Sequence, residues 1–174
     1  MTVPGAIDVI RTLAKEFSDM VVGGGTVLDR NTAEHCINAG ARFLTSTGLV
    51  PEVVESALRR DVVAIPGGLT PTEIIAAWKL GADFVKVFSA GPIGGDLNIR
   101  SLKLPLPEVR LIAAGGVNQQ TATGYVLAGA SAIGIGGELI PRDAVARRQD
   151  DRIHELARRF LAFVASVRSP DLRV

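Results

Sequence analysis

Short apolar segments recur along the chain at a nearly constant interval, each followed by a stretch with helical character. Successive segments end 21 residues apart, with a single interval of 27 residues. Such an interval has room for one strand and about three helical turns, the usual helix length. The pattern therefore indicates a repeated strand–helix unit. The segments end near Gly25, Ser46, Gly67, Phe88, Gly115 and Gly136.

Helices are predicted in the intervals, and the chain also begins and ends with one. The first helix is expected over Ala6–Phe17, ahead of a first strand over Met20–Gly23. The last, over Asp150–Val167, carries an apolar stripe at helical spacing, for which packing on neighbouring helices is favoured over a membrane surface. Thr70 and Asn118 are typical helix-capping residues. The internal helices are predicted over Asn31–Ala39, Pro51–Arg59, Pro71–Leu80 and Gln119–Ala128.

The predicted strands are apolar on both faces. Nearly every residue is apolar in Val62–Ile65, Phe84–Phe88 and Ala132–Ile135, as expected for parallel strands covered on both sides. Alternating strands and helices leave an open doubly wound sheet or a closed barrel. The period and the late glycine pairs favour a (β/α)8 barrel. No GxGxxG pattern follows the first strand, which counts against a dinucleotide-binding doubly wound fold. Because a full barrel has eight strands and about 250 residues, we expect a single partial barrel domain over residues 1–174, with six strands and without the first two.

Composition excludes several classes of protein. Hydrophobic residues make up 47% of the 174 residues and the formal net charge is +1, which gives no reason to expect a nucleic-acid or membrane partner. The single cysteine, Cys36, excludes an internal disulfide and fits the reducing cytoplasm. Neither a signal peptide nor a bilayer-length apolar stretch is visible. His35, Cys36 and His154 lack metal-ligand spacing, so no metal is expected.

One lysine lies inside a predicted apolar strand. Lys86 shares a face of this strand with Phe84 and Phe88, because side chains alternate along a strand. Burial would lower the pKa of Lys86 and leave a neutral amine, which is nucleophilic toward ketones and forms Schiff bases. Most strand lysines instead lay the stem along apolar surface and hold the ammonium in solvent. The position near the C-terminal end of the strand, where barrel active sites lie, favours the Schiff-base interpretation.

Five motifs, in order, make the chain similar to a known family. The sequence resembles the bacterial 2-keto-3-deoxy-6-phosphogluconate and 4-hydroxy-2-oxoglutarate aldolases over essentially its whole length. The resemblance implies a metal-independent class I aldolase on a (β/α)8 barrel, a small 2-keto acid substrate cleaved to pyruvate and an aldehyde, no cofactor, and a homotrimer. The motifs are Gly23-Gly24-Gly25-Thr26-Val27-Leu28, Ala64-Ile65-Pro66-Gly67, Phe84-Val85-Lys86-Val87-Phe88, Ala114-Gly115-Gly116-Val117 and Ile135-Gly136-Gly137.

The resemblance also assigns roles to individual residues. Lys86 would condense with the C2 carbonyl of the keto acid to form the Schiff base. Thr26 would bind the pyruvate carboxylate, although a threonine at this position equally suits a helix cap. Pro66 and Phe88 would line the pyruvate pocket, although either could simply fill the core.

Glycine pairs follow the last two predicted strands, where barrels often bind phosphate. These pairs, Gly115-Gly116 and Gly136-Gly137, would let backbone N–H groups approach an anion, although many glycine pairs only permit a turn. Glu138 follows the second pair, where phosphogluconate-cleaving members often have a serine. A carboxylate there should repel phosphate, which favours an unphosphorylated keto acid.

Other positions also depart from the family pattern. Family members carry a glutamate general base on a strand that precedes the region where this sequence begins. Thr2 stands where many members have an arginine. Ser89 and Ala114 replace a proline and a threonine that are common in the family. General acid–base catalysis increases the rate about 10²–10⁴-fold. Without this glutamate, turnover is expected to be slow, and we do not expect Glu138 or Glu73 to act as the general base in its place.

Two alternatives to an active aldolase stay open. The first is a non-catalytic anion-binding or assembly remnant of the fold. The second is a phosphate-binding barrel of the thiamine-phosphate synthase kind, which gives no account of the strand lysine.

Overall fold

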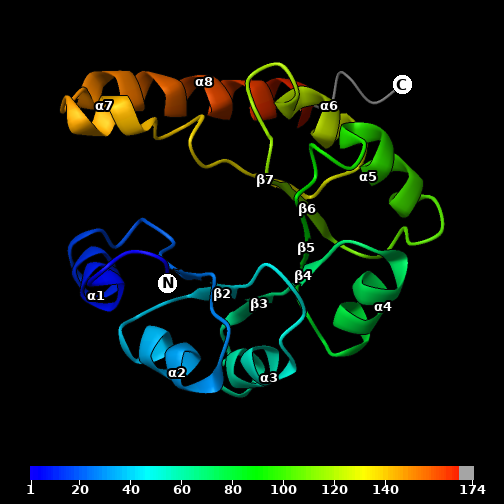
Figure 1. Ribbon diagram of the computed structural model, residues 1–174, viewed down its shortest axis with the longest axis horizontal. Helices are drawn as coiled ribbons and strands as arrows, with labels where there is room; N and C mark the ends of the chain where they lie inside the picture. The colour runs from blue at the N-terminus through cyan, green and yellow to red at the C-terminus, as the bar shows by residue number, and fades with distance from the viewer. Residues whose placement is uncertain (169–174) are drawn as a thin grey trace. The chain divides into compact units, whose positions relative to one another are not determined.

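A computed structural model describes residues 1–168 as alternating helices and parallel strands (Figure 1). These residues divide into two compact units, residues 1–88 and the described residues from Ser89 onward, called unit 1 and unit 2 below. Parallel strand pairs occur in both units, which confirms the predicted α/β class. The prediction of one domain over residues 1–174 concerns both units together and stays a prediction, and residues 169–174 lie outside the described residues.

Unit 1 alternates strands and helices along residues 1–88, as the sequence period indicated. Its strands pair in parallel in the order β1-β2-β3, and β4 pairs with β5. The strands are β1 (Gly24–Gly25), β2 (Phe43–Thr45), β3 (Val63–Ile65), β4 (Gly67–Gly68) and β5 (Val85–Phe88). The helices are α1 (Ala6–Glu16), α2 (Arg30–Asn38), α3 (Pro51–Arg59) and α4 (Pro71–Lys79).

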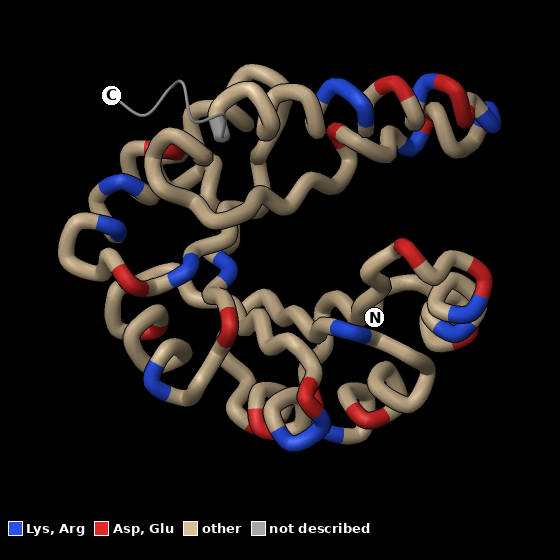
Figure 2. Tube along the Cα trace, turned by 180° about the vertical axis from the view of Figure 1, so that it is seen from behind, with Lys and Arg blue, Asp and Glu red and all other residues tan. Residues whose placement is uncertain are grey.

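Local sequence accounts for where the helices of unit 1 begin. The side chain of Asp29 caps α2 by accepting a hydrogen bond from the Thr32 N–H at 2.8 Å. Thr70 and Glu73 form a capping box at the start of α4, which confirms the predicted cap at Thr70. Charged residues of both signs are interspersed along these helices (Figure 2), and the exposed ion pair of Arg30 with Glu55 joins α2 to α3.

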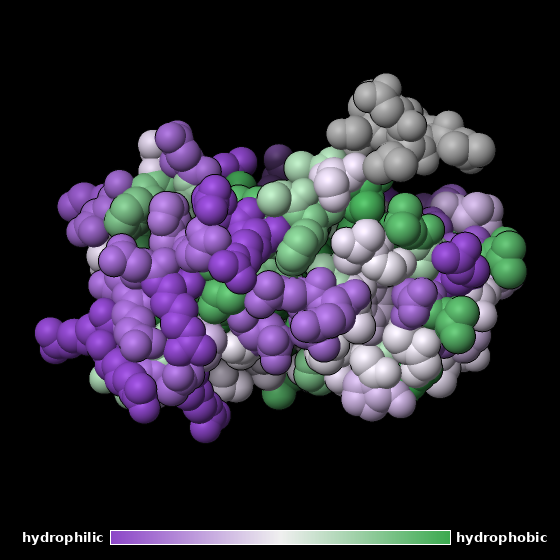
Figure 3. Space-filling model, turned by 90° about the horizontal axis from the view of Figure 1, so that it is seen from above, coloured by the Kyte–Doolittle hydropathy of each residue, from purple (hydrophilic) through white to green (hydrophobic). Residues whose placement is uncertain are grey.

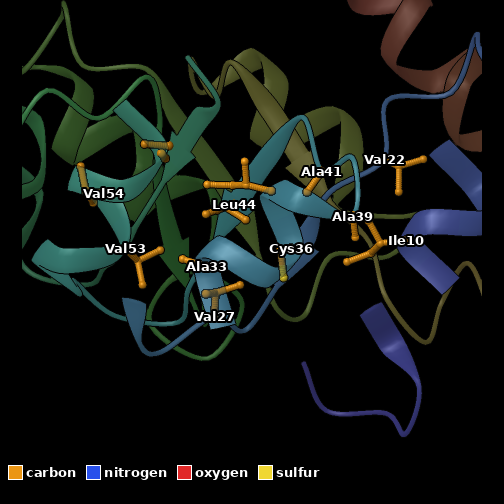
Figure 4. Close-up of a cluster of buried hydrophobic side chains, with 13 residues drawn as sticks. Ile10, Val22, Val27, Ala33, Cys36, Ala39, Ala41, Leu44, Val53 and Val54 are labelled. Carbon is orange, nitrogen blue, oxygen red and sulfur yellow. The ribbon is translucent and has the colours of Figure 1, made fainter. Parts of the chain in front are cut away.

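The hydrophobic core of unit 1 includes residues from α1, α2 and α3 and from the strands β2 and β3 (Figure 4). Val27, Ala33, Cys36 and Ala57 are completely buried in it. Leu44, at the centre of β2, also belongs to this core. Because side chains alternate along a strand, Phe43 and Thr45 lie on the opposite face of β2.

Pro66 separates β3, which lies within the predicted strand Val62–Ile65, from the two-residue strand β4. Proline has no backbone N–H, so it interrupts the ladder of hydrogen bonds. Its carbonyl oxygen still accepts a hydrogen bond from the Lys86 N–H at 2.8 Å, and the Ala64 carbonyl accepts from the Asp83 N–H at 3.1 Å. The β5 segment therefore runs beside both short strands, with Gly67 opposite Lys86 in register.

Unit 2 contains one parallel strand pair and several helices. The long helix α8 packs against α6 and α7 and buries Phe160. Figure 3 shows hydrophilic side chains gathered over α7 and the first part of α8. This distribution supports the prediction that the apolar stripe of α8 packs on neighbouring helices. No helix in the described part of the chain has both the length and the apolar character needed to span a membrane. The elements are β6 (Leu111–Ala114), β7 (Ala132–Gly134), α5 (Gly95–Lys103), α6 (Ala122–Leu127), α7 (Arg142–Ala146) and α8 (Asp150–Arg168).

Three predictions of local structure are wrong. The first strand is β1, not Met20–Gly23, because the side chains of Met20 and Val21 are exposed and parallel pairing begins at Gly24, opposite Leu44. The helix expected from Gln119 begins at Ala122. Asn118 does not cap this helix; its side chain accepts hydrogen bonds from the N–H groups of Gln120 and Thr121 in a preceding turn. The helices α5 and α7 were not predicted.

Candidate active site

Lys86 lies inside β5 of unit 1, on the face opposite to Val85 and Val87. Val85 and Val87 are completely buried, whereas Lys86 is half-buried. The backbone of Lys86 is held on the neighbouring strand by the hydrogen bond to Pro66. Lys86 is the second of the four residues of β5, so its amine extends from within the strand and two residues ahead of its C-terminal end.

The surroundings of Lys86 favour its neutral form. Burial lowers the pKa of the Lys86 amine, because removal of water penalises the ammonium. No ion pair within the described residues involves Lys86. Its Nζ lies 4.7 Å from the centroid of the Phe88 ring, a cation–π contact that favours the ammonium and so opposes the effect of burial. The combination is an amine of lowered pKa held against an aromatic ring.

Thr26 follows β1 in a strained backbone conformation. Its φ is 57°, in the left-handed region that a β-branched residue rarely adopts. Asp29, not Thr26, caps the next helix, so the alternative of a simple helix cap is excluded. Strain of this kind is typical of sites where a particular side-chain position is needed. Thr26 therefore stays a candidate for substrate binding.

Pro66 and Phe88 differ in their environments. Pro66 is completely buried, which suits the alternative in which it fills the core. Phe88 is 39% exposed and presents its ring to the reactive amine. The Phe88 ring lies close to the Lys86 amine, whereas the Pro66 carbonyl accepts a hydrogen bond from the Lys86 backbone N–H.

The sequence analysis overlooked Thr45, which also lies in unit 1. Its Oγ1 is buried and has no hydrogen-bond partner within the described residues. Thr45 is opposite Gly25 in the parallel register and lies on the face of β2 that points away from the helical core. A hydroxyl within an otherwise apolar strand was the available signal, since buried polar groups are usually paired.

The two glycine pairs lie in unit 2, and the structure gives a different reason for glycine in each pair. Gly115 and Gly116 both have φ of 81°, and a Cβ on Gly116 would lie 3.0 Å from the Cα of Gly91. The fold thus requires glycine at position 116. By contrast, a Cβ on Gly136 or Gly137 would meet no atom within 4 Å, and neither has a left-handed φ. Open space beside these two residues is compatible with the predicted approach of an anion.

The carboxylate of Glu73 is not available as a general base. The Glu73 side chain accepts hydrogen bonds from the N–H groups of Leu69 and Thr70, at 3.0 and 2.8 Å. These bonds lower the pKa of Glu73, so its carboxylate is a weak base committed to the helix cap. This agrees with the expectation that Glu73 does not replace the family's glutamate as the general base.

Among the residues that the structure describes, no cluster of three His, Cys, Asp or Glu could hold a metal ion.

Unit 1 therefore holds a half-buried amine on a parallel strand, beside an aromatic ring, which is the kind of group that Schiff-base chemistry requires. The family model of KDPG and KHG aldolases matches residues 1–156. The chain belongs to this aldolase family.

Individual relatives agree with this assignment. The chain is 35% identical over 154 residues to the KHG/KDPG aldolase of Escherichia coli (strain K12), covering 88% of this chain and 72% of the relative. It is 32% identical over 160 residues to the 2-dehydro-3-deoxy-phosphogluconate aldolase of Treponema pallidum (strain Nichols), covering 91% and 76% of the two chains.

A solved structure connects the family to covalent chemistry. The KDPG aldolase of Legionella pneumophila, with pyruvate captured at low pH as a covalent carbinolamine intermediate, superimposes with a TM-score of 0.83. The two chains are 26% identical, and the match covers 95% of this chain and 77% of the other. The similarity confirms the predicted fold class and family.

Proposed function

We propose that this protein is a class I aldolase that cleaves a 2-keto acid to pyruvate and an aldehyde through a Schiff base on Lys86. The half-buried position of the Lys86 amine and its lowered pKa carry this proposal. The neutral amine attacks the C2 carbonyl, and loss of water gives an iminium. The iminium then accepts the electron pair of the C3–C4 bond while the C4 hydroxyl loses its proton to water, so an aldehyde leaves and an enamine remains. Protonation at C3 and hydrolysis release pyruvate and restore the amine.

The other residues are proposed to bind the substrate around this amine. Thr26 would donate a hydrogen bond to the pyruvate carboxylate, for which its strained backbone is the supporting observation. Phe88 and Pro66 would limit access of water to the imine. In unit 2, the glycine pairs at 115–116 and 136–137 are proposed, from the family resemblance, to bind an anionic group through their backbone N–H groups.

Reductive trapping tests the proposal directly. Sodium borohydride with pyruvate should reduce the imine to a stable three-carbon adduct, which peptide mass spectrometry should locate on Lys86. A folded protein that yields no adduct, or an adduct only on another lysine, contradicts the Schiff-base assignment. The rate of cleavage by the purified chain separately tests the prediction of slow turnover.

The rate of trapping should depend on pH through the Lys86 amine. Because burial lowers the pKa of Lys86, the neutral nucleophile is present at lower pH than for an ordinary lysine, whose pKa is about 10.4. The trapping rate at limiting pyruvate should therefore rise with pH and level off at a lower pH than it would for an ordinary lysine. A midpoint at the ordinary lysine value would show that burial does not activate the amine.

Glu138 should select against a phosphorylated substrate. Its exposed carboxylate directly follows Gly136-Gly137, so a phosphate at this glycine pair would meet a like charge. We expect Glu138→Gln to raise the ratio of kcat/KM for phosphorylated over unphosphorylated keto acids about tenfold, from a repulsion on the order of 1–2 kcal/mol. The matched control is Glu108→Gln, which neutralises an exposed residue ahead of the N-terminal end of β6. An unchanged ratio in Glu138→Gln would place the phosphate elsewhere.

Assembly and location follow from the family resemblance. We infer a homotrimer in the cytoplasm, with a small 2-keto acid as the only partner required for the reaction. The single, completely buried Cys36 supports a reducing compartment. Light scattering on the purified protein tests the trimer, and a monomer at micromolar concentration would contradict it.

A further inference from the structure

The ring of Phe88 faces the nitrogen on which the proposed reaction takes place. Lys86 and Phe88 are two residues apart on one strand and therefore share a face. The Nζ of Lys86 lies 4.7 Å from the ring centroid, within the range over which an aromatic face attracts a cation. Phe88 thus offers the amine more than apolar surface.

Other charged groups of unit 1 near β5 are engaged elsewhere. The adjacent strand β4 consists of two glycines, and Glu73 on the packed helix α4 is held in its capping box. Asp83, just before β5, accepts a hydrogen bond from the Ala64 N–H at 2.9 Å. Lys79 lies in the last turn of α4, which precedes the N-terminal end of β5 in the chain. These carboxylates near β5 are thus committed to backbone N–H groups, whereas the Phe88 ring presents its face to the Lys86 amine.

We propose that Phe88 stabilises the positively charged iminium that Lys86 forms with a keto acid, through the face of its ring. This inference rests on the proposed function. The neutral amine, the ketone and one proton give the iminium and one water, so the positive charge is retained on the nitrogen beside the ring. The neutral carbinolamine that precedes the iminium, and the enamine that follows C3–C4 cleavage, gain nothing from the ring's quadrupole. Phe88 would therefore shift the covalent equilibrium toward the iminium.

The charge balance makes this role dependent on pH in a specific way. When the free amine is protonated, both the ammonium and the iminium lie against the ring, so its contribution to the equilibrium cancels. When the free amine is neutral, only the iminium carries the charge, and the ring favours adduct formation. Phe88 should therefore matter above the midpoint of the trapping profile and not below it. A residue that only lines the pocket would matter equally at both pH values.

The test compares Phe88→Leu, which keeps apolar bulk without a π system, with Phe88→Trp, which keeps an aromatic face. The pyruvate concentration that gives half-maximal borohydride trapping would be measured at equilibrium, above and below the wild-type midpoint. For Phe88→Leu it should rise about 2- to 30-fold above the midpoint and stay unchanged below it, since cation–π contacts contribute about 0.5–2 kcal/mol. Phe88→Trp should keep at least the wild-type value. Phe17→Leu is the control, because Phe17 is an exposed residue at the end of α1.

Three results decide the question. If the half-maximal pyruvate concentration rises equally at both pH values, Phe88 only lines the pocket. If it rises at neither value, Phe88 does not affect the equilibrium between free amine and iminium. Both outcomes overturn the inference but leave the Schiff base on Lys86 intact. Absence of any adduct in the wild-type protein would overturn the proposed function itself. If Phe88→Leu lowers the melting temperature, Phe88→Met provides a second ring-free variant for the same comparison.

Discussion

Lys86→Met should abolish both the pyruvate adduct and aldol cleavage while the protein stays folded. Methionine has a similar length and no amine, so no imine can form, and the ordinary pathway to C3–C4 cleavage is closed. We expect the loss of cleavage rate to be on the order of 10⁴- to 10⁶-fold, as when a covalent nucleophile is removed. Stability should be unchanged or slightly higher, because a half-buried amine is replaced by an apolar side chain. Borohydride trapping, a cleavage assay and thermal melting measure these three outcomes.

The matched control for this variant is Lys79→Met. Lys79 is an exposed residue in the last turn of α4, and its replacement removes the same positive charge. It should keep the adduct and the cleavage rate of the wild-type protein. The central assignment would be wrong if Lys86→Met still trapped pyruvate, or if both variants lost activity to the same extent.

Gly67→Ala should give the second large effect, a strong destabilisation. Gly67 lies in β4 opposite Lys86, and its N–H donates to the Gly48 carbonyl at 3.1 Å. A Cβ at this position would lie 2.3 Å from the carbonyl carbon and oxygen of Thr47, so backbone would have to move. Overpacking of this kind costs about 3 kcal/mol, which corresponds to a melting temperature lower by roughly 6–12 °C. Displacement of β4 should also slow trapping at Lys86.

Gly48→Ala is the corresponding control. A Cβ at Gly48 would meet no atom within 4 Å, although this residue is adjacent to the one that obstructs position 67. Its melting temperature should stay within about 2 °C of the wild-type value. A similar value for Gly67→Ala would mean that the strand can move aside at little cost, and that the close approach of β4 to the preceding loop does not position Lys86.

Helix positions were predictable because their signals are local. The helix α3 begins and ends as predicted, and α4 begins at Pro71 behind the Thr70 cap. Capping hydrogen bonds and apolar spacing act within a few residues of the chain, so the sequence contains them in full. Prediction failed where a local signal served another purpose: the Asn118 side chain forms a turn ahead of α6.

The position of the first strand shows a different limit. Met20 and Val21 are apolar but exposed, whereas the paired residues of β1 are two glycines. A Cβ on Gly24 would lie 2.8 Å from the Sγ of Cys36, so the close packing of α2 on this strand requires glycine. Such a requirement arises between segments distant in the chain, and hydrophobicity alone does not reveal it.

The sequence by itself determined the repeated strand–helix order and the family, and it singled out Lys86 as the candidate reactive residue. The period, the order of the motifs and an unusual charge in an apolar strand can all be read directly from the sequence. The tertiary structure alone decided how each of these residues is used. It showed that Phe88 faces the amine and that Pro66 is completely buried. It also separated glycines that look alike in sequence, since Gly67 is required by a backbone contact and Gly136 by none. These distinctions depend on distances between atoms from different segments, which exist only after the chain has folded.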